Sequence, residues 1–203
     1  GDKIKVGDRV ASIIGSARTI LSGERTVLNF LQTLSGTATT TAEYIAALKD
    51  TSTKLLDTRK TIPGLRTAQK YAVKIGGGSN HRKGLYDAYL IKENHIKSCG
   101  NISNAITEAR KMNPSKILEV EVQNLEEFRE ALSFKPSIIM LDNFTVADMK
   151  KAVALNSGSV KLEVSGGVDL ESLASIAKIG VDYISVGAVT KHCRAIDFSL
   201  LVE

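Results

Sequence analysis

The sequence predicts an α/β fold, namely a TIM-like α/β barrel that is closed or incomplete, and three observations support this prediction. Short apolar runs recur about every twenty residues in the second half of the chain, the length of a strand with its crossover helix and loops. The runs are almost continuously apolar, as in parallel sheets covered by helices. Polar residues follow the runs, where a barrel carries its chemistry. A doubly wound open sheet is the alternative.

The elements are expected in a regular order. Residues 3–21 alternate apolar and polar side chains around a Gly7-Asp8 turn, which predicts part of a β-hairpin. Two helices follow, at 24–34 with Gly36 as the stop and at 41–49. Pro63 can open a helix that ends at Gly76. Further helices are expected at 101–112, 125–132, 146–155 and 170–179, and strands at 54–57, 88–92, 117–122, 138–142, 161–165 and 183–187.

Composition restricts the function. The 203 residues can bury one substantial core, and 43% hydrophobic with 24% charged residues is ordinary for a globular protein. The net charge is +5, but aromatic residues are only 5% and no run of five Lys/Arg occurs, which argues against a nucleic-acid partner. Cys99 and Cys193 form no CxxC motif and no apolar run reaches the length of a membrane span. We therefore expect a cytoplasmic protein with a pocket for small anions.

Basic residues gather at two predicted strand ends and in the glycine-rich loop between them. They are Arg59, Lys60, His81, Arg82 and Lys92. Cationic groups repel one another unless an anion lies among them, so the cluster predicts a polyanionic ligand. We expect the flanking strands to bury Arg59 and Lys92. The alternative is a solvated loop or ion pairs with Asp57 and Asp87. Lys92 as a Schiff-base lysine is a weaker alternative because it leaves Arg59 and Arg82 without a role.

Carboxylates at the next strand ends form a second group. Glu119 and Glu121 alternate onto one face of their strand, so at least one of them points into the barrel mouth, and Asp142 ends the following strand. Mg²⁺ sites combine one or two such oxygens with substrate phosphates, so Glu121 and Asp142 are candidate ligands. Pairing with Lys60 or Lys92 is equally open. The three histidines have no spacing typical of a zinc site.

Small residues after the last two strands form a third group. They are Ser165, Gly166 and Gly167, and then Ser185, Val186, Gly187 and Ala188. Backbone amides at such turns bind phosphate, although glycines after strands are also ordinary turn residues.

These groups occur in runs that resemble the quinolinate phosphoribosyltransferase family. The runs are Gly23-Glu24-Arg25-Thr26-Val27-Leu28-Asn29-Phe30, Asp57-Thr58-Arg59-Lys60-Thr61, Asn80-His81-Arg82, Leu90-Ile91-Lys92-Glu93-Asn94-His95, Glu119-Val120-Glu121, Met140-Leu141-Asp142-Asn143, Glu163-Val164-Ser165-Gly166-Gly167 and Ile184-Ser185-Val186-Gly187-Ala188. They occur in order over essentially the whole chain, so the resemblance is specific.

The resemblance implies an enzyme of NAD synthesis, the carboxylating nicotinate-nucleotide pyrophosphorylase. It joins quinolinate to phosphoribosyl pyrophosphate (PRPP) with Mg²⁺, releases pyrophosphate and CO₂, and yields nicotinate mononucleotide. It further implies that the quinolinate carboxylates are surrounded by Arg59, His81, Arg82 and Lys92, with Thr58 and Lys60 alongside. Glu121 and Asp142 would hold the ribose and the metal, directly or through water. Residues 165–167 and 185–188 would bind the 5′-phosphate. Lys60, Lys92, Glu121 and Asp142 would be the catalytic residues.

The same resemblance implies an assembly and a domain division. Arg25 would reach the site of a neighbouring subunit in a homodimer or higher homo-oligomer. The family carries a longer N-terminal stretch that completes a small α+β sandwich, so residues 1–22 are expected to be a remnant of that domain and residues 23–203 the barrel. The alternatives are a non-catalytic or truncated barrel that binds phosphates, and a paralogue that acts on a related anion.

Overall fold

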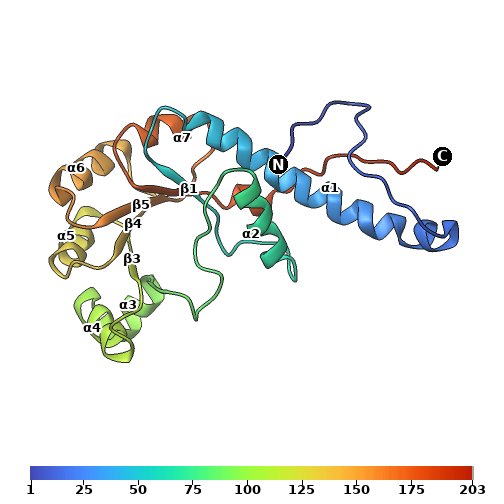
Figure 1. Ribbon diagram of the computed structural model, residues 1–203. Coiled ribbons are helices and arrows are strands. Elements are labelled where there is room, and N and C mark those ends of the chain that lie inside the picture. The colour runs from blue at the N-terminus through green and yellow to red at the C-terminus, as the bar shows by residue number, and fades with distance from the viewer. Residues whose placement is uncertain (203) are drawn as a thin grey trace.

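The computed structural model describes residues 1–202, and its centre is a parallel sheet with helices around it (Figure 1). The six strands are β1 (Lys54–Leu56), β2 (Tyr89–Ile91), β3 (Leu118–Val122), β4 (Ile138–Asp142), β5 (Lys161–Ser165) and β6 (Tyr183–Ser185). Their order is β1-β6-β5-β4-β3-β2, and every neighbouring pair is parallel. The predicted α/β barrel is therefore confirmed, and each strand falls inside its predicted range.

The sheet stays open along one side. Strands β1 and β2 are its two edges, and no ladder joins them within residues 1–202. A parallel bridge between Leu56 and Ser79 instead places the loop after α2 (Arg66–Ile75) beside β1. This loop carries His81 and Arg82, so the open side of the barrel is where the predicted basic cluster enters.

Helices cover one face of the sheet, and hydrogen-bonding side chains set where most of them start. The helices are α3 (Glu93–Cys99), α4 (Ile102–Met112), α5 (Leu125–Ser133), α6 (Val146–Asn156), α7 (Leu170–Ala177) and α8 (Ala188–Lys191). The side chains of Asn101, Asn124, Thr145 and Asp169 accept hydrogen bonds from first-turn amides of α4 to α7. The predictions for these four helices are confirmed to within two residues, whereas the short helices α3 and α8 were not predicted.

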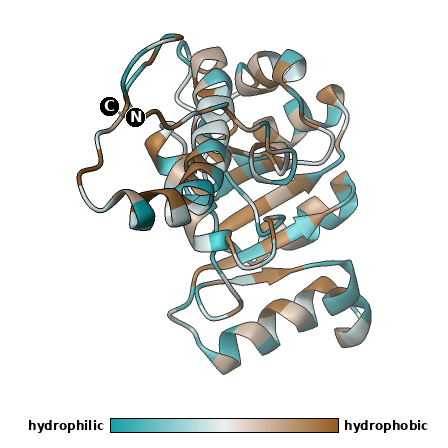
Figure 2. Ribbon diagram, turned by 90° about the vertical axis from the view of Figure 1, so that its right-hand side faces the viewer, coloured by the Kyte–Doolittle hydropathy of each residue, from teal (hydrophilic) through white to brown (hydrophobic). Residues whose placement is uncertain are grey.

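The core lies between the sheet and these helices. Alternate strand residues such as Val120, Ile139, Leu162 and Ile184 are fully buried there, because successive side chains of a strand point to opposite faces. The strands in the middle of Figure 2 are accordingly largely brown, the colour of hydrophobic residues. The opposite face of the same strands carries mainly polar side chains.

Helix α1 (Ala17–Ala47) differs from the sequence prediction, because it is one helix where two were expected. Gly36 lies inside it and does not end it. A Cβ built on Gly36 would lie 2.0 Å from the carbonyl oxygen of Arg194, so the glycine makes room for the C-terminal segment. That segment runs beside α1 in Figure 1 and is held by hydrogen bonds from Ile196 N to Gln32 O (3.1 Å) and from Cys193 Sγ to Thr33 O (3.2 Å).

The predicted hairpin at residues 3–21 is wrong. Residues 1–16 contain no strand, and α1 already begins at Ala17. The alternating side chains that suggested a strand, among them Ile4, Val10 and Ile14, are exposed. Alternation produces a strand only where a sheet edge or hairpin partner completes the hydrogen bonds, and residues 1–202 place neither beside this segment. None of the helices described here combines the length and the hydropathy needed to cross a membrane.

Candidate active site

The face of the sheet opposite the helices is lined with polar side chains. They come from alternate positions of four neighbouring strands: Glu119, Glu121, Asp142, Glu163, Ser165 and Ser185. The parallel register places Asp142 opposite Ser165 and Met140 opposite Glu163. Parallel strands therefore bring residues that are far apart in the sequence onto one interior surface.

A buried network around Asp57 holds the loop of the basic cluster against β1. Asp57 is fully buried and accepts hydrogen bonds from Lys70 Nζ, from Asn80 Nδ2 (2.6 Å) and from the backbone amide of His81 (2.9 Å). Lys70 Nζ also donates to the carbonyl oxygen of His81 (2.8 Å). Asp57 therefore forms its ion pair with Lys70, and not with a side chain of the basic cluster.

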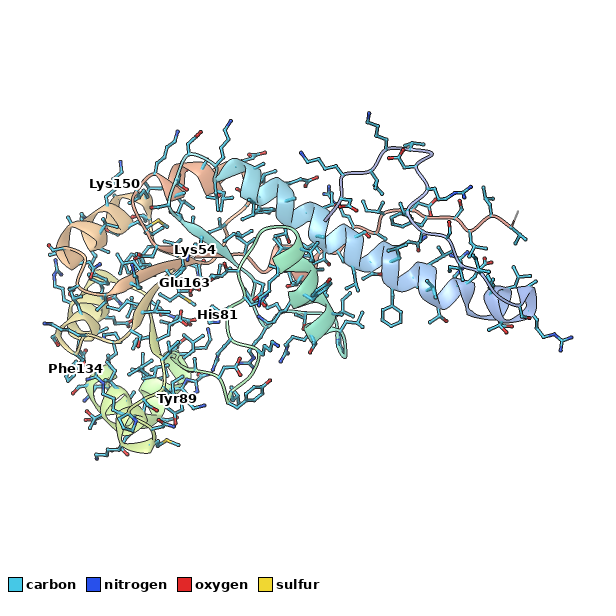
Figure 3. The ribbon with its side chains drawn as sticks, viewed as in Figure 1. Lys54, His81, Tyr89, Phe134, Lys150 and Glu163 are labelled. Carbon is cyan, nitrogen blue, oxygen red and sulfur yellow. The ribbon has the colours of Figure 1, made fainter. Side chains whose placement is uncertain are left out.

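His81 turns its side chain into the barrel, toward two buried glutamates. Its Nε2 lies 3.0 Å from Glu119 Oε2 and 3.6 Å from Glu163 Oε2, and Glu163 is 0% exposed. The labels of His81 and Glu163 lie close together in Figure 3. The ligand atoms of these three residues lie within 4.8 Å of one another, so they form the group among residues 1–202 that could hold a metal ion.

The charge states in this cluster follow from burial and proximity. Burial lowers the pKa of His81, but the hydrogen bond and charge of Glu119, together with the charge of Glu163, raise it overall. Burial, and then the charge of Glu119, raise the pKa of Glu163 to about 8. Glu163 is therefore largely a neutral acid at pH 7. The sequence carried a signal for both glutamates, because each lies between two apolar residues of its strand, but neither was among the predicted site residues.

Arg82 and Arg59 are brought together, as predicted. Burial, and then the charge of Arg59, lower the pKa of Arg82. Arg82 donates from one terminal nitrogen to the carbonyl oxygen of Ala88 (3.1 Å), while its buried Nε has no hydrogen-bond partner among the described residues. Arg59, however, is exposed and not buried as expected, because β1 ends at Leu56 and Arg59 lies in the loop beyond it.

Lys60 and Thr58 lie beside the glycine turn after β6. An ideal Cβ on Gly187 would lie 3.2 Å from Lys60 Cδ and 3.5 Å from Thr58 Oγ1. The side chain of Thr190 donates to the carbonyl oxygen of Lys60 (2.7 Å), and Gln69 links Ile62 N to the carbonyl oxygen of Thr190 by two bonds of 2.8 Å. These contacts fix the loop that carries Lys60 against α8.

The predicted metal ligands occupy different surroundings. Lys92 and Glu121 form an ion pair, with the Lys92 side chain 45% exposed and therefore not buried as expected. This pairing is the alternative that the sequence left open for Glu121. Asp142 is half-buried at the end of β4 and accepts a hydrogen bond from Asn143 Nδ2 (3.0 Å). The assignment of both carboxylates to Mg²⁺ stays a prediction.

The two predicted phosphate turns contribute unequally. Gly166 and Gly167 both have positive φ, and a Cβ on Gly166 would lie 2.3 Å from Asn143 Oδ1, so only glycine fits there. In the second turn, the side chains of Ser185 and Val186 are buried, and the Val186 amide donates to Leu56 O (3.0 Å). Within the two turns, Ser165, Gly166, Gly187 and Ala188 are partly exposed and Gly167 is exposed.

Arg25 is the predicted residue that one chain does not bring to the site. It is exposed on the N-terminal half of α1, which extends away from the sheet in Figure 1. The same half carries Val27, Phe30 and Leu31, which are 51%, 49% and 37% exposed.

The sequence matches two family descriptions that together span nearly the whole chain. Residues 37–201 match "Quinolinate phosphoribosyl transferase, C-terminal domain", and residues 1–35 match the N-terminal domain of the same family. The two matches meet inside α1. The predicted boundary at residue 22 stays a prediction, because the same helix runs through both positions.

Curated relatives and solved structures agree with these matches. The chain is 44% identical over 201 residues to the "Probable nicotinate-nucleotide pyrophosphorylase [carboxylating]" of Bacillus subtilis, covering 98% of this chain and 70% of that protein. It is similar to the nicotinate-nucleotide pyrophosphorylase structure from Francisella tularensis, with 58% identity, a TM-score of 0.87 and coverage of 89% and 65%. NadC from Streptococcus pyogenes gives 44% identity, a TM-score of 0.94 and coverage of 98% and 70%. The chain thus spans about two thirds of these proteins' length.

Proposed function

This chain belongs to the quinolinate phosphoribosyltransferase family, and we propose that it is a carboxylating nicotinate-nucleotide pyrophosphorylase. The reaction transfers the phosphoribosyl group of PRPP to quinolinate and yields nicotinate mononucleotide, pyrophosphate and CO₂. The observation that carries the proposal is the pair Arg59 and Arg82, which lie close enough for the charge of one to lower the pKa of the other. Such a pair is stabilised by a dicarboxylate, and a guanidinium matches a carboxylate in bidentate fashion.

In this reaction the protein has to position the pyridine nitrogen and to stabilise the charge on the departing pyrophosphate. The pyridine nitrogen forms a bond to C1 of the ribose while the bond from C1 to pyrophosphate breaks, and the electron pair leaves with pyrophosphate. The bond from C2 of the ring to its carboxylate then breaks, CO₂ departs, and the electron pair on C2 takes up a proton. Arg59 and Arg82 would orient the nitrogen, and such orientation can supply about 7–11 kcal/mol of the barrier. Lys60 would stabilise the departing pyrophosphate.

The residues present fit a magnesium ion at the barrel mouth. Asp142 and Glu121 offer hard carboxylate oxygens at neighbouring strand ends, which is the donor type that Mg²⁺ takes besides substrate phosphates. The ion would neutralise charge on the pyrophosphate. A Schiff-base role for Lys92 finds no support, because its side-chain nitrogen is engaged in an ion pair with Glu121.

The assembly belongs to the same proposal. Arg25 and the exposed apolar residues Val27, Phe30 and Leu31 on α1 favour a homodimer in which one protomer's Arg25 reaches its partner's site. Mixing two impaired variants, Arg25→Ala and Arg59→Ala, should then restore part of the activity, because hybrid dimers contain one site with both arginines. Light scattering should report a dimer. A monomer, or no recovery on mixing, would contradict this arrangement.

The unpaired Cys99 and Cys193 support a reducing, cytoplasmic location.

The test of the activity is a stoichiometric assay. Purified protein should convert quinolinate and PRPP to nicotinate mononucleotide, pyrophosphate and CO₂ in equal amounts, and only with Mg²⁺ present. Arg59→Ala should raise the quinolinate KM, whereas Arg110→Ala, a surface arginine that contacts Phe134 O and Lys135 O, should not. Quinolinate binding without turnover would favour a non-catalytic barrel, and turnover of a related anion alone would favour a paralogue.

A further inference from the structure

We propose that Glu119 and Glu163 are positioning residues, which act through His81 to hold Arg82 against the carboxylates of quinolinate. The inference rests on the proposed function and concerns its quinolinate subsite. Neither glutamate is at the mouth of the barrel. Both lie inside it, at 2% and 0% exposure, and His81 is the residue between them and the basic loop.

The first step is that His81 is anchored at every polar atom. Its amide donates to Asp57 Oδ1 (2.9 Å), its carbonyl oxygen accepts from Lys70 Nζ (2.8 Å), and its Nε2 faces Glu119 Oε2 (3.0 Å). Its Nδ1 accepts from the backbone amide of Arg82 (2.8 Å). Both ring nitrogens are therefore engaged within the protein. His81 is better described as the tie between loop and sheet than as a direct contact of the substrate.

The second step fixes the ring's protons. The two glutamates favour a second proton on His81, but the Arg82 amide that points at Nδ1 opposes it, because a protonated Nδ1 would place two donors against each other. The ring with a single proton on Nε2 satisfies both bonds. In that form it joins the Arg82 backbone to Glu119 in one chain of hydrogen bonds.

The third step concerns why two carboxylates are tolerated together. Glu163 faces Glu119 from β3, His81 from the loop and Ser185 from β6, with Lys70 of α2 beyond His81. Both Glu163 oxygens, Glu119 Oε1 and Ser185 Oγ are buried without a hydrogen-bond partner among the described residues. A proton on Glu163 supplies a hydrogen-bond donor to these unpartnered oxygens. The Glu119 carboxylate opposes the effect of burial on the pKa of Arg82.

The experiment compares amide and apolar variants by steady-state kinetics. Glu163→Gln reproduces a neutral hydrogen-bonding side chain and should leave the quinolinate KM within about twofold of wild type at pH 7. Glu119→Gln removes the charge and Glu163→Leu removes the polar atoms; each should raise the quinolinate KM about tenfold with kcat and the PRPP KM little changed, the pattern of lost uniform binding. Asp182→Asn is the matched control, a carboxylate at the opposite end of the strands paired with Lys161.

The pH profile separates this role from a purely structural one. Above pH 8, ionised Glu163 adds a negative charge behind the basic loop, so the wild-type quinolinate KM should rise, whereas that of Glu163→Gln should stay flat. Wild-type turnover together with Glu119→Gln and Glu163→Leu variants that behave like Asp182→Asn would overturn the inference and leave the proposed function standing. Glutamate variants in which the quinolinate KM and the PRPP KM both rise while kcat falls would also overturn the inference. Absence of wild-type turnover would contradict the proposed function itself.

Discussion

Replacing Glu163 by glutamine should make the protein more stable at neutral and alkaline pH. The folded protein raises the pKa of Glu163 from 4.5 to about 8, because the side chain is buried beside Glu119. The direction of the pH dependence follows from these two pKa values: between pH 4.5 and about 8, the folded state binds a proton on Glu163 that the unfolded state has released. Stability is therefore lost as pH rises through this window, and it is lost fully above pH 8. A neutral glutamine has no such proton to hold.

The structure sets the size of the effect. Each pH unit within the window costs about 1.4 kcal/mol, so the window from 4.5 to about 8 gives a ceiling of about 5 kcal/mol. Glu119 and His81 share the proton equilibrium with Glu163 and reduce what one substitution recovers. We expect Glu163→Gln to raise the free energy of unfolding by about 2–3 kcal/mol at pH 8 and by little at pH 5.

Urea unfolding followed by circular dichroism between pH 5 and pH 9 measures this difference. The informative quantity is the free energy of unfolding of the variant minus that of wild type, because the contributions of the other ionisable groups to its pH dependence cancel in this difference. The difference should grow with pH and level off above pH 8, while Asp182→Asn should show no such growth. A variant that is less stable than wild type at pH 8, or a difference that does not change with pH, would refute the assigned protonation of Glu163.

Two glycines offer further tests against matched neighbours. Gly166→Ala should destabilise the protein by about 2 kcal/mol or more, because its Cβ would lie 2.3 Å from Asn143 Oδ1 at positive φ; Gly167→Ala, with nothing within 4 Å, should cost about half as much in the same unfolding assay. Gly36→Ala should push the C-terminal segment off α1 and speed the reaction of Cys193 with a thiol reagent. In contrast, Gly23→Ala, in open space on the same helix, should leave that rate unchanged and stabilise the helix by about 0.5–1 kcal/mol.

Local patterns were sufficient where each residue's neighbours along the chain decide its structure. The strands could be located because short apolar runs are bounded by turn residues, and the helices α4 to α7 because Asn101, Asn124, Thr145 and Asp169 are capping residues. The basic loop and the carboxylates at strand ends could be assigned to one edge, because parallel strands end together.

Contacts between distant segments decided the rest. The sequence predicts a helix stop at Gly36, since nothing nearby in the sequence indicates that the chain near Arg194 crosses α1 there. The apolar alternation of residues 3–21 predicts a hairpin, although a strand depends on a partner that the local pattern does not specify.

The sequence by itself determined that this chain forms a parallel α/β barrel and which family it resembles, because strand periodicity, caps and ordered motifs are local properties. Only the tertiary structure decided that Arg59 is exposed, that Lys92 is paired with Glu121, and that His81 faces Glu119 and Glu163. Burial and proximity set these charge states, and both depend on segments that meet only when the sheet has formed.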